Sequence, residues 1–225
     1  MPLRSRAVPR DAVRHPLFAR YYARASVTAE TRMGMGRVRG GLLGGLSGRV
    51  IEIGAGNGLN FAHYPGTVAE VVAIEPERRL RRLAVEAALR AEVPVDVVPG
   101  AAEALPVKSE GFDAAVLSLV LCSVRDVPRA LGELRRVLRP GGEVRFFEHG
   151  RGGGRAMAAT QHALDRTVWP LLSGGCHLSR EPVRALRDAG FELGPYRRVL
   201  MPERGPVLPT SYCVLGTAWR PGARV

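Results

Sequence analysis

Residues 50–58 read VIEIGAGNG, an apolar run that ends in three glycines with the spacing G-x-G-x-G. The apolar run predicts a buried β-strand, and the glycines predict a tight turn in which the backbone approaches a ligand closely. A helix after the turn would offer free N–H groups to that ligand. Because a dinucleotide-binding fingerprint needs a glycine where Leu59 stands, the spacing favours a nucleoside-type ligand over a pyrophosphate. A strand-to-helix turn without a ligand accounts for the same glycines.

Strand-like and helix-like segments alternate along the rest of the chain, which is typical of an α/β fold. Apolar runs predict further strands at 68–75, 93–99, 112–122 and 143–149, and the continuous run at 112–122 indicates helices on both faces of the sheet. Helices are expected after Pro76, after Asp126, from the glycines at 150–154 to about Trp169, and after a cap at Ser179.

The last two strand-like segments, 191–200 and 210–219, have no helix between them, so they are expected to pair antiparallel. We therefore predict a doubly wound, Rossmann-like sheet of seven strands, mostly parallel, with an antiparallel C-terminal strand and helices on both faces.

Composition and charge exclude several classes of protein. The 225 residues are 46% hydrophobic and 24% charged, as in a globular chain, and the longest apolar stretch, 114–124, is too short to span a membrane. The net charge is +12, with nine arginines against two acids in the first 40 residues. No aromatic platform accompanies this basic arm, so we expect no specific nucleic-acid binding and at most weak association with an anionic membrane surface. Three cysteines without C-x-x-C spacing favour a reducing, cytoplasmic location.

Two acids stand close to the glycine turn. Glu52 lies inside the first predicted strand, where an unpaired carboxylate is costly, so we expect it to face a cation: a ligand ammonium, or an internal arginine such as Arg49. Glu75 closes the second predicted strand, where an acidic side chain accepts hydrogen bonds from two ribose hydroxyls. An exposed acid that caps the helix at Pro76 is the alternative for Glu75.

Linked motifs then resemble a known family. VIEIGAGNG, VVAIEP, GAAEALPV, FDAAVLSLVLCSV and LRRVLRPGGEVRFFEH together resemble the class I S-adenosylmethionine-dependent methyltransferases, in the methyltransferase type 11 group that includes quinone-biosynthesis C-methyltransferases. GNGLNFAHYP, LSLVLCSV and WPLLSGGCHLSRE are similar to the branch that includes membrane-associated thiol S-methyltransferases of animals and many bacterial relatives. The resemblance implies S-adenosyl-L-methionine as cofactor, S-adenosyl-L-homocysteine as product, and a small-molecule methyl acceptor, with a thiol as one candidate.

The resemblance also implies roles for single residues. Glycines of the turn would contact the methionine moiety, Glu52 its amino group and Glu75 the ribose. Ala101 stands where relatives carry an aspartate for the adenine, and the backbone N–H of Ala102 would hold the ring instead. The full expected cofactor set is Tyr22, Glu52, Gly54, Ala55, Gly56, Gly58, Asn60, Glu75, Pro76, Ala101, Ala102, Ser118 and Leu119.

Residues outside the central region are expected to cover the site. Residues 1–47 would form the basic arm and helices over the cofactor, with Tyr21 or Tyr22 of segment 15–26 as the contact, although amphipathic packing explains that segment equally well. Residues 48–225 would form the methyltransferase domain, with an insertion at about 150–178 over the acceptor. The expected acceptor pocket contains Cys122, Asp165, Trp169 and His177.

His149, at the end of the fifth predicted strand, is the candidate base for a thiol acceptor, and a loop histidine bonded to backbone is the alternative. Cys176 and His177 are candidates for a nucleophile and its base or for a metal pair, but no further ligands follow at suitable spacing, so we expect no metal. An NAD(P)-dependent oxidoreductase and a non-catalytic nucleic-acid-binding module are the two other function classes. The sequence carries no signal for an oligomeric state.

Overall fold

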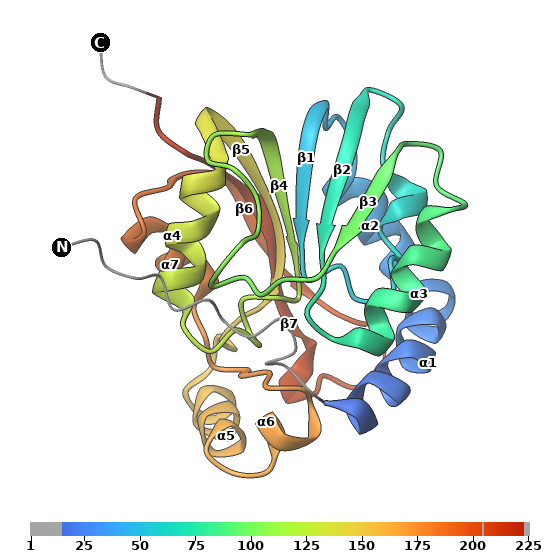
Figure 1. Ribbon diagram of the computed structural model, residues 1–225. Helices are drawn as coiled ribbons and strands as arrows, with labels where there is room; N and C mark the ends of the chain where they lie inside the picture. Colours follow the sequence, from blue (N-terminus) through green and yellow to red (C-terminus); the bar gives the residue numbers. More distant parts are fainter. Residues whose placement is uncertain (1–14, 204, 223–225) are drawn as a thin grey trace, which may run out of the picture.

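The computed structural model describes residues 15–203 and 205–222, and its centre is a seven-stranded sheet in the order β3-β2-β1-β4-β5-β7-β6 (Figure 1). The strands follow the runs predicted above, and their bounds are β1 Gly48–Ile53, β2 Val68–Ile74, β3 Val95–Val98, β4 Phe112–Ser118, β5 Leu138–His149, β6 Glu192–Leu200 and β7 Tyr212–Trp219.

The carboxyl ends of β1 to β5 lie at the same edge of the sheet, because these strands run parallel to one another. β1 pairs parallel with β2 and β4, β2 with β3, and β4 with β5, whereas β7 runs antiparallel between β5 and β6. The predicted fold class is confirmed. The chain crosses from one side of β1 to the other between β3 and β4, and ligands of such sheets bind at the carboxyl ends of the strands beside this switch point.

Helices cover both faces of the sheet (Figure 1). The face formed by Ile51, Ile53 and Leu117 packs against α4 and α7, and the opposite face packs against α2 and α3. The helix after Asp126 buries Ala130, Leu131, Leu134 and Val137, and Asp126 Oδ1 accepts the Arg129 N–H at 3.0 Å and caps the helix. The helices are α1 Pro16–Arg32, α2 Met35–Leu43, α3 Arg78–Ala88, α4 Val127–Val137, α5 Arg155–Asp165, α6 Trp169–Leu172 and α7 Pro182–Asp188, with short 3-10 turns at Phe61–His63 and Pro209–Ser211.

Three local predictions are wrong. The fourth strand ends at Ser118 and not near 122, because Leu119 adopts a left-handed conformation (φ 60°) and the chain turns out of the sheet. The helix expected to reach Trp169 ends at Asp165, and a separate short helix begins at Trp169. Ser179 does not cap α7, because its hydroxyl donates to Asp165 and Glu181 precedes the helix instead.

The segment between β5 and α7 lies beyond the carboxyl ends of the strands, where α5 and α6 pack against each other (Figure 1). Among the residues that the structure describes, no helix is both long and apolar enough to cross a lipid bilayer.

Candidate active site

The glycine turn after β1 adopts a backbone that needs its glycines. Gly54, Gly56 and Gly58 have φ values of 68°, 59° and 79°, in the left-handed region that side chains rarely adopt. A Cβ on Gly58 would lie 2.7 Å from the ring of Phe61 and 2.8 Å from the Cβ of Ala87. The turn is therefore fixed by conformation and by close packing against its neighbours.

Glu75 fastens this turn to the end of β2. Its side chain is 4% exposed, Oε2 accepts the Gly56 N–H at 2.7 Å and Oε1 accepts the Glu77 N–H at 2.8 Å. Burial raises the pKa of Glu75 to about 7, although both backbone hydrogen bonds act to lower it. The alternative of an exposed cap is wrong, since the α3 cap is Glu77, whose Oε2 accepts the Leu80 N–H at 2.8 Å.

Glu52 is buried at the other side of the turn. Its oxygens accept hydrogen bonds from Asn60 Nδ2 at 2.8 Å and from the Tyr64 hydroxyl at 2.7 Å. Burial raises the pKa of Glu52 to about 7, and these two hydrogen bonds lower it only in part. Arg39 reaches Glu52 indirectly by donating to Asn60 Oδ1. The proposed partner Arg49 pairs with Glu70 instead.

Helix α1 covers the glycine turn through Tyr22. A Cβ on Gly56 would lie 3.3 Å from Cε1 of Tyr22, and Asn57 Nδ2 donates to the Ser26 hydroxyl at 3.1 Å. The neighbouring Tyr21 is 70% exposed. Of the two tyrosines named from the sequence, Tyr22 is therefore the one that faces the site.

The other residues predicted to contact the cofactor all lie at or shortly after the carboxyl ends of β1 to β4. Asn60 is held by Glu52 and Arg39, and the Ala55 N–H donates to the Ile74 carbonyl at 3.1 Å. Whether they contact the cofactor stays a prediction. They are Ala55, Asn60, Pro76, Ala101, Ala102, Ser118 and Leu119.

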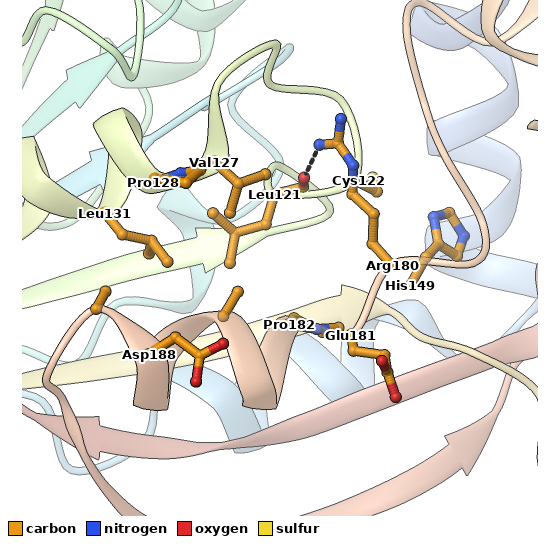
Figure 2. Close-up of a pocket in the computed structure, with 12 residues that line it drawn as sticks. Leu121, Cys122, Val127, Pro128, Leu131, His149, Arg180, Glu181, Pro182 and Asp188 are labelled. Carbon is orange, nitrogen blue, oxygen red and sulfur yellow. Dashed lines mark hydrogen bonds between the residues drawn. The ribbon is translucent and has the colours of Figure 1, made fainter.

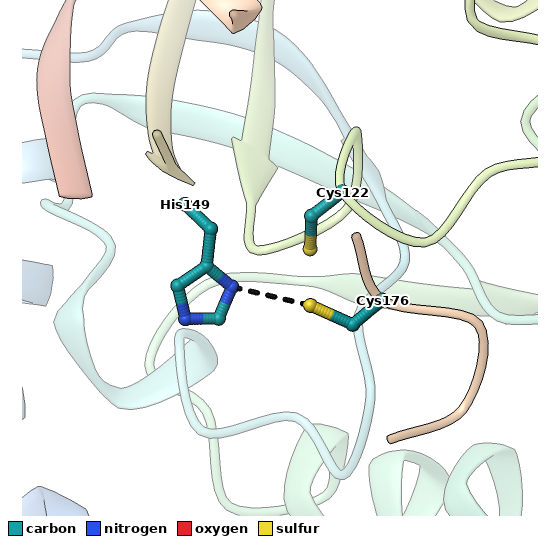
Figure 3. Close-up of side chains that lie close together, drawn as sticks. All are labelled: Cys122, His149 and Cys176. Carbon is teal, nitrogen blue, oxygen red and sulfur yellow. Dashed lines mark hydrogen bonds between the residues drawn. The ribbon is translucent and has the colours of Figure 1, made fainter. Parts of the chain in front are cut away.

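A cluster of three metal-ligating or nucleophilic side chains lies at the ends of β4 and β5 (Figure 3). Cys176 Sγ is 3.5 Å from His149 Nδ1, and Cys122 Sγ lies within 4.8 Å of both atoms. Burial lowers the pKa of His149, but the neighbouring Cys122 and Glu148 raise it, and the net shift is upward. His177, the expected companion of Cys176, instead places Nδ1 2.8 Å from the Gly175 carbonyl.

A cavity of about 390 Å³ opens between α4 and α7 and reaches this cluster (Figure 2). Cys122, His149 and Arg180 stand at one end, and apolar residues of α4 and α7 form much of the remaining wall. Arg180, which the sequence interpretation missed, donates to the carbonyls of Leu121 and Val124. Its only sequence signal is its place in the motif WPLLSGGCHLSRE, and the fold brings it to Cys122.

Three of the four residues predicted for the acceptor pocket do not line this cavity. Asp165 accepts hydrogen bonds from the Leu178 N–H at 2.7 Å and the Ser179 N–H at 2.9 Å, which ties α5 to the following loop. Trp169 packs against the cysteines of the cluster, and its buried indole N–H has no hydrogen-bond partner among the described residues. His177 faces its own loop.

Comparisons with known proteins agree with this geometry. A family model described as a methyltransferase domain matches residues 51–146. Human thiol S-methyltransferase TMT1A is 35% identical over 157 residues, which cover 65% of this chain and 62% of that protein. Residues 51–146 therefore match the methyltransferase-domain family, and the relatives found over most of the chain are named as methyltransferases. It spans about three fifths of the length of the human enzyme.

Solved structures share the fold of this chain. A SAM-dependent methyltransferase of Thermotoga maritima has a TM-score of 0.63 at 23% identity, over 91% of this chain and 98% of that one. The N-methyltransferase NodS of Bradyrhizobium japonicum, in complex with S-adenosyl-L-homocysteine, has a TM-score of 0.64 at 16% identity, over 87% and 91% of the two chains.

The chemistry of the residues around the glycine turn fits S-adenosylmethionine. Glu52 and Glu75 are buried carboxylates, and among the described residues neither forms a direct ion pair with an arginine. A ligand with an ammonium group, a sulfonium and ribose hydroxyls would supply the charge and donors that these acids lack. Each carboxylate oxygen of Glu75 keeps a lone pair for a ribose hydroxyl beyond the backbone N–H that it accepts.

Proposed function

We propose that this methyltransferase transfers a methyl group from S-adenosylmethionine to the sulfur of a small thiol bound in the cavity between α4 and α7. The observation that carries the proposal is the composition of that cavity. Its walls are largely apolar. Its inner end combines Arg180, His149 and Cys122, beside the carboxyl ends of β4 and β5. The likeness to a protein named as a thiol S-methyltransferase supports the choice of acceptor.

The residues at the strand ends have separate tasks in this proposal. The glycine turn and Glu52 bind the methionine part of the donor, and Glu75 binds the ribose. Tyr22 of α1 excludes water from the turn. The bound cofactor supplies the activated methyl group, so the protein mainly aligns the acceptor, an effect worth up to about 7 to 11 kcal/mol in favourable cases.

Activation of the thiol is assigned to the inner end of the cavity. A free thiol has a pKa of about 8.5, so only a few per cent is ionised at pH 7. His149 stands where the acceptor must lose its proton, and the Arg180 guanidinium provides positive charge for the thiolate. Removal of His149 should therefore lower thiol turnover and spare cofactor binding.

The proposal also includes the surroundings of the site. Helices α1 and α2 in the segment 15–47 cover the cofactor, and the insertion at about 150–178 covers the acceptor. Residues 1–14, which hold part of the expected basic arm, lie outside the described residues. The protein works in the cytoplasm, where its three cysteines stay reduced. No specific nucleic-acid partner is included, and contact with an anionic membrane is at most weak. An NAD(P)-dependent reaction is disfavoured because Leu59 replaces the third fingerprint glycine.

Calorimetry and a substrate screen test the proposal. We expect the full chain to bind S-adenosylhomocysteine with micromolar affinity and to bind neither NAD nor a random oligonucleotide. With labelled S-adenosylmethionine, label should appear on small thiols from a panel of thiols, amines and phenols. No binding of S-adenosylhomocysteine would overturn the whole proposal, and label on amines or phenols alone would overturn its thiol part.

A further inference from the structure

We propose that Cys122, Cys176 and His149 bind one Zn²⁺ ion, whose open fourth position faces the cavity and takes the sulfur of the acceptor. The ion site follows from the three side chains alone. Its role in activating a thiol rests on the proposed function, and there the ion replaces His149 as the group that deprotonates the acceptor, because a histidine that binds Zn²⁺ has no nitrogen left to take up a proton.

One pair of ligand atoms has the spacing that Zn²⁺ requires, and the third ligand atom lies close to both. With Zn–S near 2.3 Å and Zn–N near 2.0 Å, a tetrahedral site separates sulfur and nitrogen by about 3.5 Å and two sulfurs by about 3.8 Å. Cys176 Sγ and His149 Nδ1 are 3.5 Å apart, and all three atoms lie within 4.8 Å of one another. Hydrogen bonds among the three side chains account for the same proximity without an ion, and metal analysis decides between the two interpretations.

The ligands come from three segments that are bonded to one another. The Cys122 carbonyl accepts the His177 N–H at 2.8 Å, which joins the loop after β4 to the loop that carries Cys176. Glu148, next to His149, accepts the N–H groups of Val120 at 2.9 Å and Leu121 at 3.0 Å. The three side chains therefore stay together without an ion, as a preorganised metal site requires.

The surroundings favour a buried ion with an open side. Leu178, Leu164 and Trp169 pack against the two cysteines, while Cys122 and His149 also line the cavity. Apolar groups thus cover one side of the cluster, and the other side opens toward the place proposed for the acceptor. Three protein ligands with an open fourth position are the usual arrangement of catalytic zinc.

Charge balance selects Zn²⁺ over Cu⁺. Two thiolates and a neutral imidazole make a site with Zn²⁺ uncharged. With Cu⁺ the site would carry one negative charge before the acceptor binds and two after it binds as a thiolate, beside the single guanidinium of Arg180. When an acceptor thiolate adds one negative charge, Arg180 in the wall of the same cavity offsets it. Filling the site releases two protons, from Cys122 and Cys176.

The ion would activate the acceptor by deprotonating it. A thiol bound to Zn²⁺ gives its proton to solvent, and its sulfur then forms the bond to the methyl carbon. The bond between that carbon and the cofactor's sulfur breaks, and its electron pair stays on that sulfur. The product is a neutral thioether, a weaker ligand than a thiolate, so it leaves the ion.

Metal analysis of the full chain tests the site without an activity assay. We expect about one Zn²⁺ per chain, its removal by a chelator, and its replacement by Co²⁺ with the absorption of a tetrahedral thiolate site. Cys122→Ser and Cys176→Ser should each weaken Zn²⁺ binding by more than the roughly 10- to 100-fold that loss of an outer-shell partner costs. Cys213→Ser is the matched control, because Cys213 is buried opposite His149 in β7 but lies outside the cluster.

The outcomes separate this inference from the proposed function. Folded wild-type protein that binds neither Zn²⁺ nor Co²⁺, or that carries a Cys122–Cys176 disulfide as isolated under reducing conditions, would overturn the metal site. If the chelated protein binds S-adenosylhomocysteine and methylates thiols at the full rate, the activating role fails and the proposed function stands. Failure to bind S-adenosylhomocysteine, with Zn²⁺ still bound, would remove the proposed function alone. A shift of the Co²⁺ spectrum on addition of an acceptor thiol is the expected result for the open position.

Discussion

Glu52 and Glu75 are buried acids whose pKa is about 7 in the folded protein, against an ordinary value of 4.5. The folded chain thus holds protons on these groups at a pH where the unfolded chain has lost them. This contribution to stability is fully present below pH 4.5 and is lost as the pH rises through 7. A ligand with an ammonium group and hydroxyls favours the ionised acids, so it binds better on the alkaline side.

The affinity for S-adenosylhomocysteine should therefore rise between pH 6 and pH 8. An acid with a pKa near 7 goes from about one-tenth to about nine-tenths ionised over that range, so each acid contributes up to about tenfold. Glu52→Gln should remove its part of the dependence. Calorimetry at three pH values checks this, with Glu70→Gln as the surface control. An affinity independent of pH would contradict the assignment of both acids.

Glu75→Ala should weaken S-adenosylhomocysteine binding by about 1.5 to 3 kcal/mol, as for hydrogen bonds to a charged group. It should also lower the free energy of unfolding, because the N–H groups of Gly56 and Glu77 lose their acceptor. Glu77→Ala is the matched control, since it removes only the α3 cap, worth about 0.5 to 2 kcal/mol of stability. If both variants bound the ligand as wild type does, Glu75 would not contact the ribose.

Sequence and structure agree best on residues whose role is local. The tight turn of the three glycines could be predicted from their spacing, and the place of Glu75 beside that turn from its position at a strand end. Its contact with a ribose stays a prediction. The partners of Glu52 could not, because Tyr64 and Arg39 reach it only through the fold. The cluster of Cys122, His149 and Cys176 could not be predicted for the same reason. His149 is 27 residues from each cysteine, and no known metal-binding spacing links the three.

Among the secondary-structure elements, α1 most directly affects the cofactor site. Tyr22 faces the glycine turn, and Phe18, one turn earlier, packs so closely on Gly174 that a Cβ there would lie 2.5 Å from its ring. The helix thus contacts both the glycine turn and the loop that carries Cys176. Its position should influence the binding of donor and acceptor together.

Tyr22→Ala should weaken S-adenosylhomocysteine binding by about 1 to 3 kcal/mol, the range for burial of a large side chain, mainly through faster dissociation. Tyr21→Ala, a change of the same size at a 70% exposed position, should stay within about 0.5 kcal/mol of wild type. Stopped-flow dissociation rates compare the two. Equal effects would mean that α1 acts on the site only through general packing.

The pattern of elements was largely predictable because apolar periodicity reflects burial on a sheet face. The failures occur where a side chain far away in sequence redirects the backbone. Residues 119–124 are apolar enough for a strand, yet Glu148 accepts the N–H groups of Val120 and Leu121 and draws them out of the sheet. Ser179 has the chemistry of a cap, but Asp165 binds its hydroxyl first.

Taken as a whole, the molecule should respond to its ligand as a single cooperative unit, because the site is built from the ends of central strands. S-adenosylhomocysteine at 100 times its Kd should stabilise the fold by about 2.7 kcal/mol. For a chain of this size that raises the Tm by roughly 5 to 11 °C. Differential scanning fluorimetry measures the shift, and NAD at the same concentration should give none. A comparable shift with NAD would favour the oxidoreductase class.

The place of β7 between β5 and β6 has a consequence for how the chain matures on the ribosome. Until the residues up to Trp219 have left the exit tunnel, β5 lacks a neighbour on one side and β6 has none. The nascent protein thus carries bare strand edges, which invite pairing with other chains, through most of its synthesis. Nonsense or frameshift mutations between β6 and β7 should consequently be as damaging as those before β1, and the insoluble fraction of the truncated products measures the effect.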